Sequence, residues 1–201
     1  MSNALVVENY ANAIVIKFNR PEIRSPLSIF VLEELREILE EAAKNDSLER
    51  IIFTGKADAF ASGADLREIA AVTENTAREF AVRGQDLMNK IANSKQKTIA
   101  AINGFCFGGA LDLALACDRR IASPSAVFCH PGVGLGIITG WSGTQRLPRL
   151  IGESKALEMF LTAKRVGASE ALRIGLIDKI SENPRAESLA NNRFDSSSII
   201  V

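Results

Sequence analysis

The sequence predicts a single α/β domain, and three observations carry that prediction. Short apolar runs of strand length alternate along the chain with longer segments whose apolar residues recur at helical spacing. Glycine-containing turns join several of these runs to the helical segment that follows. The chain has 201 residues, of which 47% are hydrophobic, so it is long and apolar enough to bury a core. The same composition excludes disorder over most of its length.

In the first half of the chain, we expect a β-hairpin followed by helices that alternate with strands. Residues 5–8 and 13–18 predict two strands joined by a turn at residues 9–12. Ser28 is a suitable N-cap for the next helix, whose apolar face carries Phe30, Val31, Leu35, Ile38, Leu39 and Ala42. The pattern then predicts, in order, a strand at 50–54, a loop at 55–63, a short helix at 65–71 and an amphipathic helix at 75–93.

In the second half, we expect a strand at 98–102, a glycine turn and a helix that ends at Cys117. Short strands at 120–122 and 126–129 and a glycine-rich loop at 131–136 follow. The last expected elements are helices at 142–151, 153–162 and 169–174 and a strand at 176–180. After Pro184 the composition changes, and residues 191–198 (NNRFDSSS) are polar and low in apolar content. We therefore divide the chain into a domain at residues 1–184 and a polar C-terminal tail at residues 185–201, which we expect to be poorly ordered.

The charge balance argues against two classes of partner. The 24 Lys and Arg residues match the 24 Asp and Glu residues, so the net charge of +0 provides no bulk attraction for nucleic acid or for an anionic membrane. The apolar stretch at 99–117 contains Gly104, Gly108 and Gly109, which favour a strand, a turn and a buried helix over a membrane span. We therefore expect neither nucleic acid nor membrane as a partner.

The three cysteines, Cys106, Cys117 and Cys129, lie among apolar residues and show no CxxC spacing. We interpret them as small buried hydrophobic residues. With a single histidine, they are too few for a disulfide scaffold or a multi-histidine metal site, so we expect no metal. The N-terminus shows no secretory signal pattern, and unpaired cysteines favour a reducing compartment, so we expect a cytoplasmic protein.

Two segments share a design that suggests a chemical role. Residues 60–66 and 103–112 each follow an expected strand, turn through glycine and open a helix. Such a turn leaves backbone N–H groups without acceptors at the positive end of the helix dipole. Two turns that face each other could hold one oxygen and stabilise a developing oxyanion. The alternative is that the glycines only change the direction of the chain, and spacing alone favours this alternative.

Four segments, taken in order, resemble the crotonase superfamily, the enoyl-CoA hydratase/isomerase family. Residues 19–28 (NRPEIRSPLS) resemble its N-terminal box, although Ser25-Pro26 replaces the usual Asn-Ala. Residues 59–66 (AFASGADL) and 103–109 (NGFCFGG) resemble its two oxyanion segments, and residues 140–147 (GWSGTQRL) resemble a helix start of the family. The match runs from about residue 5 to residue 180, and the four motifs together are specific.

This resemblance implies a ββα spiral core, an acyl-CoA thioester as substrate, no cofactor beyond the CoA moiety, and assembly as a homotrimer or hexamer. It implies that the N–H groups of Ala64 and Gly109 hold the thioester carbonyl oxygen. It also implies a set of residues near CoA, although an exposed arginine is more often a solvated charge: Arg24, Asp65, Leu66 and Arg67. Family members usually continue with further helices, so the C-terminal helical segment looks shortened, which would leave the acyl pocket more open or completed by a neighbouring subunit.

Two positions depart from the hydratase pattern. Family hydratases place two glutamates around a water, whereas here Asp112 aligns with the first and Gly132 with the second. A displacement of about 1 Å can cost roughly 10²-fold in rate, and a missing acid/base group costs roughly 10²–10⁴-fold. We therefore predict inefficient hydration by the two-glutamate route. Asp112 also has a structural interpretation, because an aspartate in the first turn complements the helix dipole.

Three functions follow from these residues. The first is an enzyme of the enoyl-CoA hydratase/isomerase type that stabilises a thioester enolate, and isomerisation needs only one acid/base group. The second is a catalytically impaired acyl-CoA-binding or assembly subunit, and the third is C–C or thioester cleavage on the same oxyanion hole.

His130 precedes the loop in which Gly132 replaces the glutamate, and an ordinary histidine pKa of about 6.5 suits proton transfer. A lone histidine in a loop is more often structural. Trp141 and Phe107 are expected to pack or to line the acyl pocket.

Overall fold

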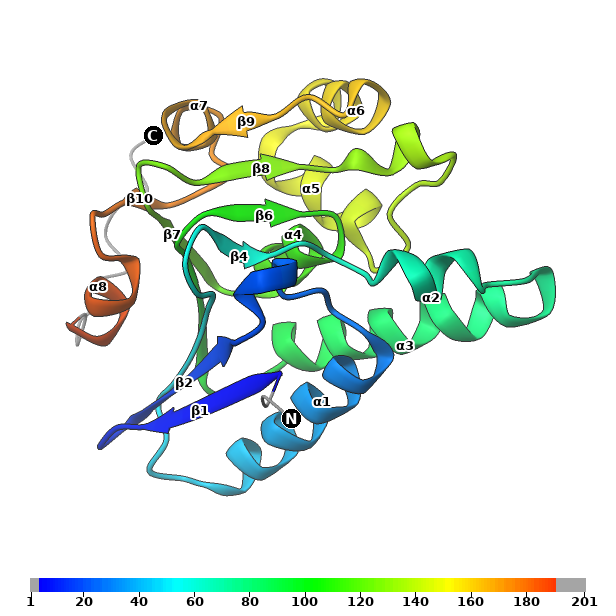
Figure 1. The fold of residues 1–201 in the computed structure, drawn as a ribbon. Coiled ribbons are helices and arrows are strands. Elements are labelled where there is room, and N and C mark those ends of the chain that lie inside the picture. The colour runs from blue at the N-terminus through cyan, green and yellow to red at the C-terminus, as the bar shows by residue number, and fades with distance from the viewer. Residues whose placement is uncertain (1–3, 191–201) are drawn as a thin grey trace.

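The strands form two sheets, which the computed structural model describes over residues 4–190 (Figure 1). The larger sheet has the order β1-β2-β3-β5-β7-β10 and comprises β1 (Leu5–Asn9), β2 (Ala13–Phe18), β3 (Arg50–Thr54), β5 (Lys97–Ile102), β7 (Arg119–Ala122) and β10 (Lys179–Ile180). The smaller sheet has the order β4-β6-β8-β9 and comprises β4 (Ala59–Ala61), β6 (Phe105–Phe107), β8 (Val127–Cys129) and β9 (Val166–Gly167). Neighbouring strands are parallel except in the pairs β1–β2 and β8–β9.

Helices connect and cover the sheets. In chain order they are the 3-10 helix η1 (Pro21–Ile23), α1 (Ile29–Lys44), α2 (Leu66–Ala70), α3 (Glu74–Ala92), α4 (Gly109–Ala116), the 3-10 helix η2 (Pro131–Leu135), α5 (Gly143–Ile151), α6 (Glu153–Thr162), α7 (Ala168–Arg173) and α8 (Pro184–Ala190). The Ser28 side chain accepts a hydrogen bond from the Val31 N–H at 3.4 Å, which confirms the expected N-cap of α1.

The elements repeat in a fixed order that explains where the site lies. Strands β3, β5 and β7 of the larger sheet lead into β4, β6 and β8 of the smaller sheet, and each of these leads into a helical segment. This is the ββα spiral that the sequence resemblance implies. Because β4, β6 and β8 are parallel neighbours, the three turns that follow them lie at the same end of the smaller sheet, where ligands commonly bind in α/β proteins.

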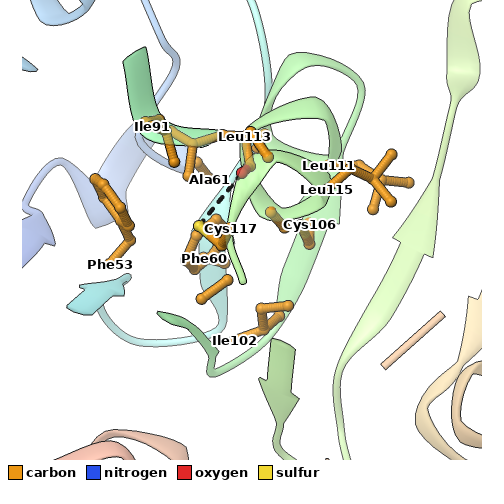
Figure 2. Packing of buried hydrophobic residues seen from close by; sticks show 14 of the residues in the cluster. Phe53, Phe60, Ala61, Ile91, Ile102, Cys106, Leu111, Leu113, Leu115 and Cys117 are labelled. Atoms are coloured by element: carbon orange, nitrogen blue, oxygen red, sulfur yellow. Dashed lines mark hydrogen bonds between the residues drawn. The ribbon is translucent and has the colours of Figure 1, made fainter. Parts of the chain in front are cut away.

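The main core lies between the two sheets and the helices, and α4 runs through it (Figure 2). Every residue of α4 is buried, which is typical of a helix that is apolar all round. Cys106 and Cys117 pack in this core, and the Cys117 thiol donates a hydrogen bond to the Leu113 carbonyl at 3.4 Å. All three cysteines are free and buried, as the sequence predicts.

The structure differs from the sequence prediction mainly in short strands. Residues 59–61, expected in a loop, form β4, and the expected glycine turn contains β6. Strands of two or three residues are too short to show a periodic pattern, and they form here because they pair with neighbours. The expected last strand at 176–180 is reduced to β10.

The C-terminal prediction also needs correction. Residues 185–190, expected in a poorly ordered tail, belong to α8, and Ser188 is fully buried. Leu189 of α8 packs on the second face of the larger sheet, where Ile52 and Ile99 are buried. Arg50 of β3 donates hydrogen bonds to the carbonyls of Ser188 and Leu189, at 3.2 and 2.9 Å. Residues 191–201 of the expected tail lie outside the described residues.

The apolar stretch at 99–117 is divided into β5, β6 and α4, as the glycines predict. Between residues 4 and 190, no helix combines the length and the apolar character that crossing a membrane requires.

Candidate active site

Two backbone N–H groups meet at the carboxyl ends of β4 and β6. A Cβ atom built on Gly109 would lie 3.4 Å from the amide nitrogen of Ala64, so the two amides are close neighbours. Both residues line a cavity of about 390 Å³. Gly109 is the first residue of α4, and within residues 4–190 neither of the two amides has a backbone acceptor. The predicted pair of donors is therefore brought together at one cavity.

Hydrogen bonds and one glycine conformation fix this arrangement. Gly63 has a φ of +92°, and a Cβ there would lie 2.6 Å from the Phe107 carbonyl oxygen. The Leu27 N–H donates to the Gly63 carbonyl at 2.8 Å, which anchors the first turn. The Gly108 N–H donates to the Cys129 carbonyl at 2.9 Å, which ties the second turn to β8. Backbone contacts thus set the positions of both amides.

The Trp141 ring is a supporting feature that the sequence interpretation did not identify in this role. A Cβ on Gly109 would lie 2.4 Å from this ring, and a Cβ on Gly84 of α3 would lie 2.1 Å from it. The indole therefore fills the space between two helices, where it also contacts the Phe80 ring at a centroid distance of 5.8 Å. Trp141 both packs and lines the cavity. A glycine in the middle of a predicted helix was the available signal for this contact.

Asp112 supplies a carboxylate to the same cavity. It lies in the first turn of α4 with no exposed surface, and it accepts a hydrogen bond from the Thr139 hydroxyl. Burial raises the pKa of Asp112 to about 7, and the hydrogen bond from Thr139, the backbone N–H of Trp141 and the charge of Arg146 oppose that rise. Such a group can both take and give a proton near neutral pH.

Gly132 lines the cavity, and the backbone around it leaves no room for a side chain. It lies in η2, and a Cβ there would meet the Ile137 carbonyl oxygen at 2.7 Å. The Ile137 N–H donates to the Gly132 carbonyl at 3.0 Å, which closes the segment on itself. A glutamate at this position would therefore require the backbone of residues 132–137 to move.

His130 stands beside Asp112. Its side chain is 3% exposed, and its Nε2 lies 3.6 Å from Oδ1 of Asp112. The imidazole packs against the Phe160 ring at a centroid distance of 5.0 Å. Burial lowers the pKa of His130 to about 4, which favours the neutral ring. His130, for which the sequence left both a catalytic and a structural role open, lines the same cavity.

The predicted CoA-contacting residues are less clearly grouped. Leu66 lines the cavity, whereas Asp65 caps α2 through the Arg67 N–H at 2.9 Å. The Arg67 guanidinium bonds both oxygens of Asp65, at 3.0 and 2.7 Å, and keeps the pKa of that carboxyl below its usual value. Arg24 stacks on the Phe105 ring at 4.8 Å and lies 3.9 Å from Asp58. Neither arginine belongs to the cavity lining.

Over the described ranges, three or more His, Cys, Asp or Glu side chains nowhere converge so as to hold a metal ion.

A ββα spiral of this kind is shared with solved crotonase-fold structures. The family model described as "Enoyl-CoA hydratase/isomerase" matches residues 8–194. The chain therefore belongs to the enoyl-CoA hydratase/isomerase family of the crotonase superfamily.

Several known proteins are similar to this chain. It is 36% identical to the short-chain-enoyl-CoA hydratase of Clostridium acetobutylicum, over 90% of this chain and 69% of that protein. It is 38% identical to the crotonyl-CoA hydratase of Syntrophomonas wolfei, over 88% of this chain and 68% of that protein. The crystal structure of enoyl-CoA hydratase from Bacillus anthracis superposes with a TM-score of 0.84 at 38% identity, and covers 89% of this chain and 70% of that one.

Proposed function

We propose that this protein binds an acyl-CoA thioester and stabilises its enolate between the N–H groups of Ala64 and Gly109. The observation that carries the proposal is the meeting of these two amides with the Asp112 carboxyl at one cavity. Negative charge that develops on the thioester oxygen would be held by two fixed donors, the Ala64 N–H between β4 and α2 and the Gly109 N–H at the start of α4, and each such donor is worth roughly 10²–10³ in rate.

Asp112 is the proposed acid/base residue. In isomerisation, its carboxylate removes a proton from the α-carbon of a 3-enoyl-CoA, and the electron pair moves onto the thioester oxygen to give a dienolate. Asp112 then returns the proton to the γ-carbon, which gives the 2-enoyl-CoA. One carboxyl with a pKa of about 7 serves both half-reactions, because it is present in both protonation states near neutral pH.

The CoA moiety is the second part of the proposal. The mostly apolar lining, which includes Leu66, Val72 and Phe80, suits an acyl chain. We assign the exposed Arg24 and Arg67 to the phosphates of CoA, with Asp65 holding Arg67 in position. We further propose that no other cofactor is needed and that the protein acts in the cytoplasm as a homotrimer or hexamer.

The test is a comparison of two substrates. We expect the purified protein to convert 3-hexenoyl-CoA to 2-hexenoyl-CoA, measured as a rise in enoyl thioester absorbance. Hydration of crotonyl-CoA, measured as a fall in the same absorbance, is expected to be slower, because Gly132 supplies no second carboxylate. A protein that binds these thioesters and turns over neither would contradict the proposed activity.

A second function, a catalytically impaired acyl-CoA-binding subunit, is favoured by one observation. The segment at Gly132 is closed against Ile137 and has no space for a side chain. Calorimetric binding of butanoyl-CoA, without turnover of any enoyl-CoA, would support this second function. Failure to bind any CoA ester would exclude both.

A further inference from the structure

The pair formed by His130 and Asp112 has three buried polar atoms without a hydrogen-bond partner in the described part of the chain. They are Oδ1 of Asp112 and both ring nitrogens of His130. A buried polar atom that loses its bond to water without gaining another partner destabilises the folded protein. Both side chains are almost completely buried, and both line the cavity that contains the two amides. Because both side chains line the cavity, a substrate or a water bound there is placed to supply the missing partners.

The position of His130 adds to this argument. It is the last residue before Pro131 and Gly132, so it enters the cavity from the same segment that fails to supply a side chain at Gly132. The Phe160 ring packs against the imidazole and holds it near Asp112. The separation of 3.6 Å between Nε2 and Oδ1 is slightly longer than a hydrogen bond, so a small movement would allow direct proton exchange.

We propose that His130 is a second catalytic residue of this site, which works with Asp112 as a proton-transfer pair and makes hydration available where Gly132 supplies no side chain. This inference rests on the proposed function, because it needs the enolate to form between Ala64 and Gly109.

The reaction balances with one proton on the pair. Neutral His130 accepts a proton from water as the water oxygen bonds to the β-carbon of a 2-enoyl-CoA, and the electrons of the double bond move toward the thioester oxygen. Protonated Asp112 donates its proton to the α-carbon, which gives the 3-hydroxyacyl-CoA. The protonated imidazole then returns a proton to the Asp112 carboxylate across the pair and restores the starting state.

Other groups near the pair do not compete for this proton. Arg146 of α5 acts on Asp112 as a fixed positive charge. Cys106 of β6 and Cys129 of β8 are buried thiols whose pKa values are raised, so they stay neutral. Phe160 of α6 presents only an apolar ring. Asp112 and His130 are therefore the exchanging groups at this place.

The first test separates the two reactions. In His130→Gln, hydration of crotonyl-CoA is expected to fall by roughly 10²–10⁴-fold, and isomerisation of 3-hexenoyl-CoA is expected to fall far less, because Asp112 carries out both of its proton transfers. His130→Asn is prepared alongside, and circular dichroism checks the folding of both. Phe160→Leu is the control: it loosens the packing of the ring and leaves the imidazole, so it should not reproduce the split between the reactions.

Equal hydration by the wild type and by folded His130→Gln would overturn the inference. So would a wild type that isomerises 3-hexenoyl-CoA but does not hydrate crotonyl-CoA. A wild type that performs neither reaction would instead count against the proposed function. Failure of this inference can therefore be distinguished from failure of the proposed function.

The second test does not depend on turnover. The chain contains a single histidine, so a protein labelled with ¹⁵N-histidine gives the signals of His130 alone. We expect these signals to shift as Asp112 titrates near pH 7, and we expect Asp112→Asn to abolish that shift. Signals that are identical in the wild type and in Asp112→Asn from pH 5 to pH 9 would show that the two groups do not exchange a proton.

Discussion

The two walls of the cavity are built in different ways. The wall formed by Ala64 and Gly109 uses backbone N–H groups, whose positions follow from the pairing of β4 with β6 and of β6 with β8. The other wall, which we call the side-chain wall, uses the side chains of Asp112 and His130, and Gly132 contributes no side chain to it. In the proposed mechanism, the fold itself provides oxyanion stabilisation, whereas the side chains decide which protons can move. In that mechanism the first wall defines a family of reactions, and the second selects among them.

Substitution of Asp112 should have the largest effect on the side-chain wall. Asp112→Asn keeps the shape and removes the acid/base group, so both isomerisation and hydration should fall by roughly 10²–10⁴-fold. Steady-state rates with 3-hexenoyl-CoA and crotonyl-CoA measure this. Asp112→Glu keeps the carboxyl and moves it by about 1 Å, so it should retain more activity than Asp112→Asn. Normal turnover by folded Asp112→Asn would remove this residue from the mechanism.

A matched pair of glycine variants tests the backbone wall. Gly109→Ala places a methyl group 2.4 Å from the Trp141 ring and displaces an oxyanion donor, so turnover should fall by roughly 10²–10³-fold. Gly84→Ala crowds the same ring from α3 without touching an amide of the site. Both should lose about 1–3 kcal/mol of stability in urea unfolding. Equal losses of rate in the two variants would mean that Trp141 packing, and not the amide, controls turnover.

Asp112 and His130 should contribute opposite pH dependences to the free energy of unfolding. Burial raises the Asp112 pKa from 3.8 to about 7, so its stabilising contribution is present below pH 4 and is lost as pH rises to 7. Burial lowers the His130 pKa from 6.5 to about 4, so its contribution is present above pH 6.5 and is lost as pH falls to 4. Between pH 4 and 6.5 the two slopes therefore cancel.

Single substitutions should reveal each slope. Asp112→Asn should become more stable with rising pH in this window, and His130→Gln less stable, each relative to the wild type and by up to about 1.4 kcal/mol per pH unit. Urea unfolding at half-unit pH steps measures this. Slopes of the same sign in both variants would contradict the burial of one of the two groups.

The smallest effect is expected outside the cavity. The Arg67 side chain is 81% exposed and already bonds Asp65. Arg67→Ala should raise KM for an acyl-CoA by only a few-fold and leave kcat unchanged, because an exposed and screened charge contributes little to binding. Arg67→Lys should restore most of the loss. A large fall in kcat would instead connect α2 to the chemical step.

The sequence predicts the backbone wall better than the rest of the molecule. The motifs around Gly63 and Gly109 are local, so their turns and donors can be located without a structure. The short strands β4 and β6 escape prediction because they depend on partners more than 40 residues away. The helix α8 escapes because its seven residues are too few to show a helical periodicity. The signal for it lay in β3, which is buried on both faces and therefore needs cover.

The side-chain wall shows a second limit. The sequence identifies Asp112 and Gly132 through the family pattern, but it does not show that His130 lies 3.6 Å from Asp112 or that Trp141 packs between Gly84 and Gly109. These contacts join segments far apart in the chain. Only the tertiary fold brings them together, and the one local sign, Gly84 in the middle of a predicted helix, does not identify the side chain that packs against it.

Proton exchange at the α-carbon tests the central claim most directly. Butanoyl-CoA cannot be hydrated or isomerised, but an enzyme that stabilises its enolate must exchange its α-protons with solvent. In D₂O, we predict that the wild type introduces deuterium at the α-carbon, observed by proton NMR, and that Asp112→Asn does so at least roughly 10²-fold more slowly. Bound butanoyl-CoA that acquires no deuterium would contradict enolate formation between Ala64 and Gly109.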